Sequence, residues 1–264
     1  MNIAIEIFGI LGALATIGLG IPQLIQQLKT KKTGKVNFAS FWIFYVGILL
    51  WVAYGVFAGP RYWQVFIANF VCIAIYSATM FYLYYYREDK NKKLMLQVIL
   101  GIVFVLLLTL LLAIIFTINI VDWFKSGRPE KGHNYPIPIL SESYRSVIAA
   151  IAPSLTTLAF LPQLIISLKK KDFKGLTPWM PFLFMINNGL WIIYFILIPV
   201  HKTALIGAQQ AWLEVMPALI WQIVSLTIYA IQFGMIYSYY KKMGKHVEKN
   251  KSEPLEIDST ILEK

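Results

Sequence analysis

Aromatic and amide side chains recur at matching positions inside two long apolar stretches of this chain. Trp51 returns 140 residues later as Trp191, and Asn69 is matched 153 residues later by another amide, Gln222. An amide in apolar surroundings costs roughly a few kcal/mol unless it is paired, and it offers two donors and one acceptor oxygen. An indole can lay its apolar face on a ring while its N–H donates. These residue types therefore fit the binding of a neutral solute that carries several hydroxyl groups.

Each of these residues also has a purely structural interpretation. A buried amide can make a helix–helix hydrogen bond, which contributes only about 0.6 kcal/mol on average in membranes. A tryptophan near a helix end can belong to the aromatic belt at the membrane surface. Matching positions in two repeats favour a shared cavity instead. Asn187 joins the candidate set because it lies four residues before Trp191, on the same helix face, whereas its neighbour Asn188 is turned away by about 100°.

A Pro-Gln pair also occurs twice, as Pro22-Gln23 and Pro162-Gln163. Both pairs lie about two turns before the end of an apolar stretch, and a lysine-rich loop follows each. Proline removes one backbone hydrogen bond and loosens a helix. We therefore expect the two prolines to act as hinges of an inner gate, with the two glutamines as local amide partners for the freed carbonyl groups.

Long apolar stretches must position these residues, and their length indicates membrane-spanning helices. The chain has 264 residues, of which 58% are hydrophobic and 14% charged, whereas a soluble domain carries about 25% charged residues. About 20 apolar residues span a bilayer, and helices satisfy their own backbone hydrogen bonds there. The sequence predicts an all-α integral membrane protein with seven spanning helices, at residues 4–28, 38–58, 62–86, 94–121, 144–168, 178–199 and 213–240.

The repeats indicate two three-helix units joined by one extra helix. The first unit covers residues 4–86 and the second residues 144–240. The segment 94–121 has no counterpart, and we interpret it as a linker helix that gives both units the same orientation. Such parallel repeats are related by an axis along the membrane normal, with a solute site at their interface. An outer loop at 122–143 and a tail at 241–264, which we expect to be disordered, complete the chain.

The positive charge of the chain is unevenly distributed between the loops. The net charge is +11, which could indicate nucleic acid, but the basic residues lie in short loops between apolar segments. Four lysines or arginines lie in each of the loops 29–37, 87–93 and 169–177, and six more follow residue 240; only six lie in the remaining loops. Basic residues favour the cytoplasmic side. We therefore predict an outside N-terminus, a cytoplasmic C-terminus and a plasma-membrane location.

Several classes of site are disfavoured by the residue types present. Cys72 is the only cysteine, so there is neither a disulfide framework nor a cysteine metal cluster. The sequence lacks a glycine-rich phosphate loop and a nucleophile elbow, which argues against an enzyme or a bound cofactor. No acidic residue lies in the middle third of a predicted helix, and Glu214 comes closest. Proton-coupled carriers usually bury such a group, so the placement of the acidic residues predicts an uncoupled carrier. The expected partners are a small solute, the lipid bilayer and possible further copies of the chain.

The doubled Pro-Gln pair, the basic loops and the linker helix together resemble the PQ-loop repeat family, over about residues 4–240. The three-plus-one-plus-three plan is most similar to its SWEET branch, which moves sugars down their gradient. In that branch a tryptophan on the second helix of each repeat and an asparagine on the third line the sugar site. Trp51, Asn69 and Trp191 match this pattern. Gln222 departs from it: the amide group is kept, but the side chain is one methylene longer than that of asparagine.

The resemblance leaves other functions open. Related families of the same plan carry amino acids or a vitamin, either by facilitated transport or coupled to protons. Another family with this plan does not transport and instead retrieves proteins by binding their termini in a basic pocket. The predicted core here lacks lysine and arginine, which favours a neutral solute. The sequence thus predicts facilitated transport of a mono- or disaccharide, with amino-acid or vitamin transport and a receptor or sorting role as alternatives.

Overall fold

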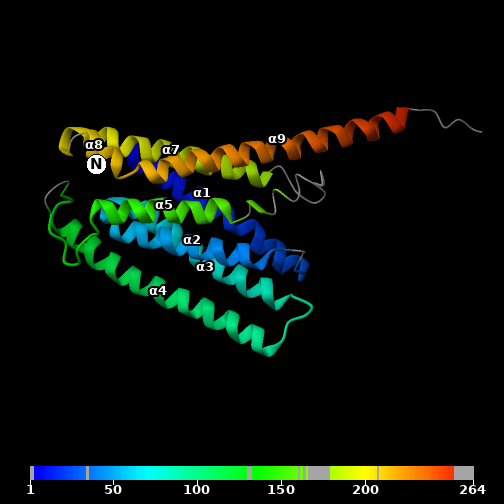
Figure 1. Cartoon of the computed structure of the whole chain (residues 1–264), viewed down its shortest axis with the longest axis horizontal. Coiled ribbons are helices and arrows are strands. Elements are labelled where there is room, and N and C mark those ends of the chain that lie inside the picture. The colour runs from blue at the N-terminus through cyan, green and yellow to red at the C-terminus, as the bar shows by residue number, and fades with distance from the viewer. Residues whose placement is uncertain are drawn as a thin grey trace, which may run out of the picture.

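The computed structural model describes residues 3–33, 36–129, 133–159, 161–162, 165, 179–206 and 208–252. Within these residues the regular structure is entirely helical (Figure 1). The helices are α1 (Ile3–Thr30), α2 (Phe38–Phe57), a short 3₁₀ helix η1 (Pro60–Tyr62), α3 (Trp63–Tyr85), α4 (Lys92–Lys125), α5 (Glu142–Leu158), α7 (Trp179–Ile206), α8 (Ala208–Leu213) and α9 (Met216–Ser252).

Six helical segments of the described chain are long and apolar enough to cross a membrane. They are α1, α2, η1 with α3, α4, and the segments Trp179–His201 and Met216–Lys241. The chain is therefore an all-helical integral membrane protein, as predicted. The remaining predicted span, 144–168, corresponds to α5, which has 17 residues, and most of the predicted span after residue 158 lies outside the described residues. The number of crossings remains a prediction.

Capping groups set helix ends that apolar content alone does not define. The side chain of Asn37 accepts a hydrogen bond from the backbone N–H of Ala39 at the start of α2, and Asn91 accepts one from Leu94 at the start of α4. Helix α4 ends at Lys125, and φ becomes positive just beyond it, at Gly127 and Arg128, where the chain turns. The linker helix, predicted at 94–121, accordingly spans Lys92–Lys125.

Helix α9 runs past the expected end of its span. We expected residues 241–264 to be disordered, but α9 is helical as far as Ser252. Residues 253–264 lie outside the described part. Lysine and glutamate are good helix formers, and a helix that already exists extends without a new nucleation step. A charged composition therefore does not end a helix that leaves the membrane, which is why the expectation was wrong for residues 241–252.

The helices form two three-helix units of the same internal order. Helix α3 packs against both α1 and α2, and α9 packs in the same way against α5 and α7. The most extensive helix contacts between the described parts of the two units are α1 on α7 and α2 on α5. Because α1 corresponds to α5, and α2 to α7, these two contacts are equivalent. Helix α4 packs on α2 and α3 and flanks the first unit (Figure 1).

One end of the bundle is packed by a core that both units share. We call it the N-terminal end, since the N-terminus, α8 and the end of α4 lie there, while the loop after α3 lies at the opposite end (Figure 1). Its buried core includes Trp51 and Tyr54 from the first unit and Trp191, Tyr194 and Phe195 from the second. The buried members of a second core come from α2, α3 and α4. The two units are thus joined mainly at the N-terminal end.

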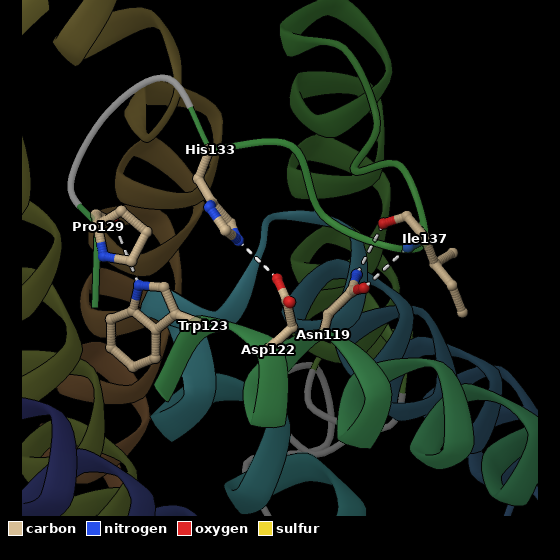
Figure 2. A network of polar contacts seen from close by, with 6 residues as sticks. All are labelled: Asn119, Asp122, Trp123, Pro129, His133 and Ile137. Atoms are coloured by element: carbon tan, nitrogen blue, oxygen red, sulfur yellow. Dashed lines mark hydrogen bonds and ion pairs between the residues drawn. The ribbon is translucent and has the colours of Figure 1, made fainter. Parts of the chain in front are cut away.

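The segment after α4 is tied to that helix by polar contacts (Figure 2). Asn119 donates to the carbonyl oxygen of Ile137 at 2.8 Å and accepts from its N–H at 3.1 Å. His133 Nε2 lies 2.6 Å from the carboxylate of Asp122. The indole of Trp123 donates to the carbonyl of Pro129 at 3.2 Å. These contacts fold the segment back on α4 and so fix where α5 can begin.

We expect Asn119→Ala to lower the apparent melting temperature of the detergent-solubilised protein. Asn119 is 2% exposed, and its loss leaves both backbone groups of Ile137 without this partner, at a cost of about 1–3 kcal/mol. Thr117→Ala is the matched control, since the exposed Thr117 bonds only the Ala113 carbonyl of its own helix within the described part of the chain. Equal melting temperatures for the two variants would contradict this role of Asn119.

Candidate functional site

A cavity of about 320 Å³ lies between the two units and is bordered by α1, α2, α3, α5, α7 and α9. Helix α4 contributes no residue to the described lining, and its role as a linker remains a prediction. The structure brings all five predicted solute-binding residues to this cavity: Trp51, Asn69, Asn187, Trp191 and Gln222. Their grouping was predicted from repeat positions, and their binding role remains a prediction.

Aromatic rings close the cavity toward the N-terminal end. Phe195 lies between the two tryptophans, with its ring centre 6.4 Å from Trp51 and 5.9 Å from Trp191. Both indoles are buried, and each makes an edge contact with the tyrosine three residues on, Tyr54 or Tyr194. The tryptophans therefore form the floor of the cavity and do not lie in an aromatic belt at the membrane surface.

Thr16 of α1 fixes the two candidate residues of α7. Its hydroxyl lies 2.7 Å from the Oδ1 atom of Asn187 and accepts a hydrogen bond from the Trp191 indole at 2.8 Å. The hydroxyl also lies 2.8 Å from the carbonyl of Gly12, and a Cβ atom at Gly12 would come within 3.1 Å of the Trp191 ring. The Trp191 indole is thus held by the other repeat, which orients it toward the cavity.

The equivalent contact between α2 and α5 is made by close packing. Thr156 occupies the repeat position of Thr16, and Gly47 that of Asn187. A Cβ atom at Gly47 would lie 2.7 Å from the methyl group of Thr156, so the two helices need a glycine there. Among the described residues, the Thr156 hydroxyl bonds only carbonyls of its own helix. The site is therefore chemically asymmetric, although its frame is repeated.

The remaining amides differ in how much of their bonding capacity is used. Asn69 donates to the Val65 carbonyl at 2.8 Å, and its oxygen has no hydrogen-bond partner among the described residues. Asn188 also borders the cavity, and it donates to the Phe184 carbonyl at 2.7 Å. Gln222 is half-buried and lines the cavity from α9. Asn69 and Gln222 thus line the cavity from different repeats.

The hinge and gate candidates lie away from the tryptophans. Pro22 lies inside α1, and its side chain is exposed on the outer surface of the bundle. Gln23, its neighbour, lines the cavity, so it is placed to meet a solute as well as a carbonyl group. Pro162 is helical and exposed. Gln163 lies outside the described residues.

Two polar clusters seal the N-terminal end beyond the aromatic floor. In one, Tyr194 donates to Gln64 at 3.2 Å, and Gln64 donates to Glu6 at 2.6 Å. In the other, Glu214 accepts from Tyr62 at 3.2 Å and from Arg145 at 3.4 Å. Each cluster joins side chains of both repeats. Glu214, the acidic residue closest to a predicted helix centre, is thus buried beside an arginine outside the cavity.

The described lining of the cavity is uncharged. It contains amide, hydroxyl, thiol, aromatic and aliphatic side chains but no Asp, Glu, Lys, Arg or His. Burying an isolated charge is costly, and a charged ligand would need an opposite charge or a metal nearby. The described residues also hold no group of three His, Cys, Asp or Glu side chains that could bind a metal. This chemistry suits a neutral polar ligand.

Sequence reasoning missed Thr16 and Phe195. Thr16 opens the first Pro-Gln repeat as Thr156 opens the second, so the spacing of 140 residues contained a signal for it. Phe195 stands where the first repeat has Gly55. A comparison of the repeats cannot find a residue of this kind, because it occurs in one repeat alone.

These features define a helical membrane protein in which two similar units enclose an uncharged cavity. The PQ loop repeat model matches residues 4–64 and 144–200. The chain therefore contains two PQ-loop repeats, which supports the predicted PQ-loop family. No curated protein matches the chain.

We expect Thr16→Val to lower the apparent melting temperature more than Thr156→Val. Valine keeps the shape of threonine, but at position 16 it leaves Asn187 and Trp191 without their partner. Interhelical hydrogen bonds in membranes contribute about 0.6 kcal/mol on average and at most about 1.7 kcal/mol, so the loss should be about 1–3 kcal/mol. Thr16→Ser should keep the wild-type value. The bonding assigned to Thr16 would be wrong if both valine variants melted alike.

Proposed function

We propose that this protein is an uncoupled transporter of a small neutral polar solute, with a mono- or disaccharide as the favoured substrate. The observation that carries the proposal is the uncharged cavity between the two repeats, bordered by a tryptophan and an amide from each. PQ-loop proteins are often membrane transporters, which also favours a transport function. The protein supplies binding groups alone, and we propose neither an enzymatic activity nor a cofactor.

Recognition of the solute rests on groups that are free to bond. The indole N–H of Trp51 and the amide oxygen of Asn69 have no hydrogen-bond partner among the described residues, and both side chains are buried at the cavity. A sugar presents hydroxyl groups that both donate and accept. The tryptophan faces offer apolar surface to the C–H groups of a sugar ring.

The transport step is a rocking of the repeats about this site. The N-terminal end is closed by the aromatic floor and the two polar clusters, while residues such as Gln23 and Gln232 extend the lining toward the opposite end. We assign the N-terminal end to the outside of a plasma membrane, so this structure represents an inward-facing state. Pro22 and Pro162 interrupt the backbone bonding of their helices, which allows each helix to bend near the inner end.

The first test is uptake of labelled glucose by proteoliposomes that contain the purified protein, without an imposed ion or pH gradient. We expect saturable uptake that stops at equal concentrations. Asn69→Ala should reduce it at least about tenfold, because the variant loses its amide bonds to the solute and leaves a gap in the cavity wall. Asn91→Ala is the control, since Asn91 is an exposed helix cap outside the cavity.

Normal uptake by a folded Asn69→Ala protein would remove Asn69 from the site. Absence of glucose uptake by the wild type would remove glucose as a substrate, and a panel of disaccharides and neutral amino acids should then be measured in the same vesicles.

A second test addresses proton coupling, which a buried acidic residue could supply. Glu214 is 7% exposed and is paired with Arg145. We therefore expect it to help close the N-terminal end of the bundle and not to carry protons. An imposed proton gradient should therefore change neither the initial rate nor the final level of uptake. Accumulation above the outside concentration that is lost in Glu214→Gln would instead support the proton-coupled alternative, with an amino acid or a vitamin as substrate.

A further inference from the structure

We propose a second solute-binding point in the same cavity, built around the hydroxyl group of Tyr76 and nearer the opposite end than the tryptophans. The inference rests on the proposed transport function. Tyr76 lines the cavity and is 6% exposed, yet its hydroxyl has no hydrogen-bond partner among the described residues. A buried hydroxyl without a partner costs about 1–3 kcal/mol, so such a group calls for an explanation.

The position of Tyr76 separates it from the site described above. It lies seven residues after Asn69 on α3, which places it on the same helix face and about 10 Å further along the helix axis. Its ring is fixed by neighbouring aromatic rings, with centres 5.1 Å from Phe44 and 5.6 Å from Tyr45. The ring is therefore held in one place at the cavity wall, and almost none of the hydroxyl oxygen is exposed in this state of the protein.

Other polar groups lie at this level of the cavity. A Cβ atom at Gly20 of α1 would come within 3.1 Å of the Ile75 side chain, so Tyr76 is level with Gly20. Gln23 follows one turn later on α1 and lines the cavity. On α9 the repeat counterpart of Tyr76 is Tyr229, and Gln232 follows it by one turn; both also line the cavity.

These residues provide donors and acceptors for a solute beyond the reach of Trp51 and Asn69. The two glutamine amides line the cavity in this state and would bond hydroxyl groups of the solute. The Tyr76 hydroxyl is covered here, and it would bond the solute when the proposed rocking of the repeats uncovers it. A solute that leaves the upper site toward the cytoplasm thus exchanges one set of partners for another. A carrier gains from such a pair of sites, because a single tight site would slow release.

The experiment compares Tyr76→Phe with Tyr45→Phe. Both variants remove one buried hydroxyl from the same aromatic cluster, but the Tyr45 hydroxyl lies 2.5 Å from Ser77, and Tyr45 does not line the described cavity. The readouts are the apparent melting temperature without solute and the KM and maximal rate of labelled glucose uptake in proteoliposomes.

We expect Tyr76→Phe to keep or raise the melting temperature and to raise KM about fivefold, the change that corresponds to one neutral hydrogen bond. Tyr45→Phe should lower the melting temperature and leave KM unchanged. A Tyr76→Phe protein that melts as low as Tyr45→Phe would show that its hydroxyl is bonded within the protein, which overturns the inference.

The inference and the proposed function can fail separately. An unchanged KM in Tyr76→Phe, with a wild type that transports glucose, overturns the second binding point alone. A wild type that takes up none of the tested solutes overturns the proposed function. In that case the melting temperatures still decide whether the Tyr76 hydroxyl is free.

Discussion

Two equivalent helix contacts, α1 on α7 and α2 on α5, determine where the rest of the site lies. Helices in a membrane gain little from hydrophobic burial, because lipid is as apolar as their side chains, so they associate through close packing and interhelical hydrogen bonds. In this protein, the contact of α1 with α7 uses hydrogen bonds, and the contact of α2 with α5 uses close packing. Thr16 bonds Asn187 and Trp191 across the first, and Gly47 admits Thr156 at the second. The cavity is the space that remains where the two units diverge from these contacts.

The asymmetry of the site follows from substitutions within a repeated frame. Gly47 and Asn187 occupy equivalent positions, as do Asn69 and Gln222. A duplicated frame with identical residues would offer a solute two equivalent orientations. The differences leave the Asn69 oxygen without a partner among the described residues in one repeat and tie Asn187 to α1 in the other. An asymmetric solute would therefore bind in one preferred direction.

The sequence predicted the parts of this structure that depend on local composition or on repetition. Apolar length marked the spans, since each spanning helix needs about 20 such residues, and the repeat grouped Trp51 with Trp191. The bond from Thr16 to Trp191 joins residues 175 positions apart, and periodicity contains no information on which helix faces lie opposite each other. For the same reason, the sequence does not show that the Tyr76 hydroxyl lacks a partner among the residues that the structure describes. The length of α9 was misjudged because charge was taken as a stop signal, although helix extension depends on propensity and on an existing helix.

The composition of the closed end suits a carrier that has no energy source. Such a carrier must exchange between two states whose free energies differ by only a few kcal/mol. An end sealed by apolar contacts alone would lose its full burial energy on opening. Two polar clusters seal this end together with the aromatic floor. In the proposed rocking, their groups would exchange protein partners for water, at a net cost of about 0.5–1.5 kcal/mol for a neutral bond and about 1.5–3 kcal/mol for a bond to a carboxylate. The pair of Glu214 and Arg145 also regains hydration that it loses in the closed state. Opening is therefore less costly than the buried area of this end implies, which is what uncoupled exchange requires.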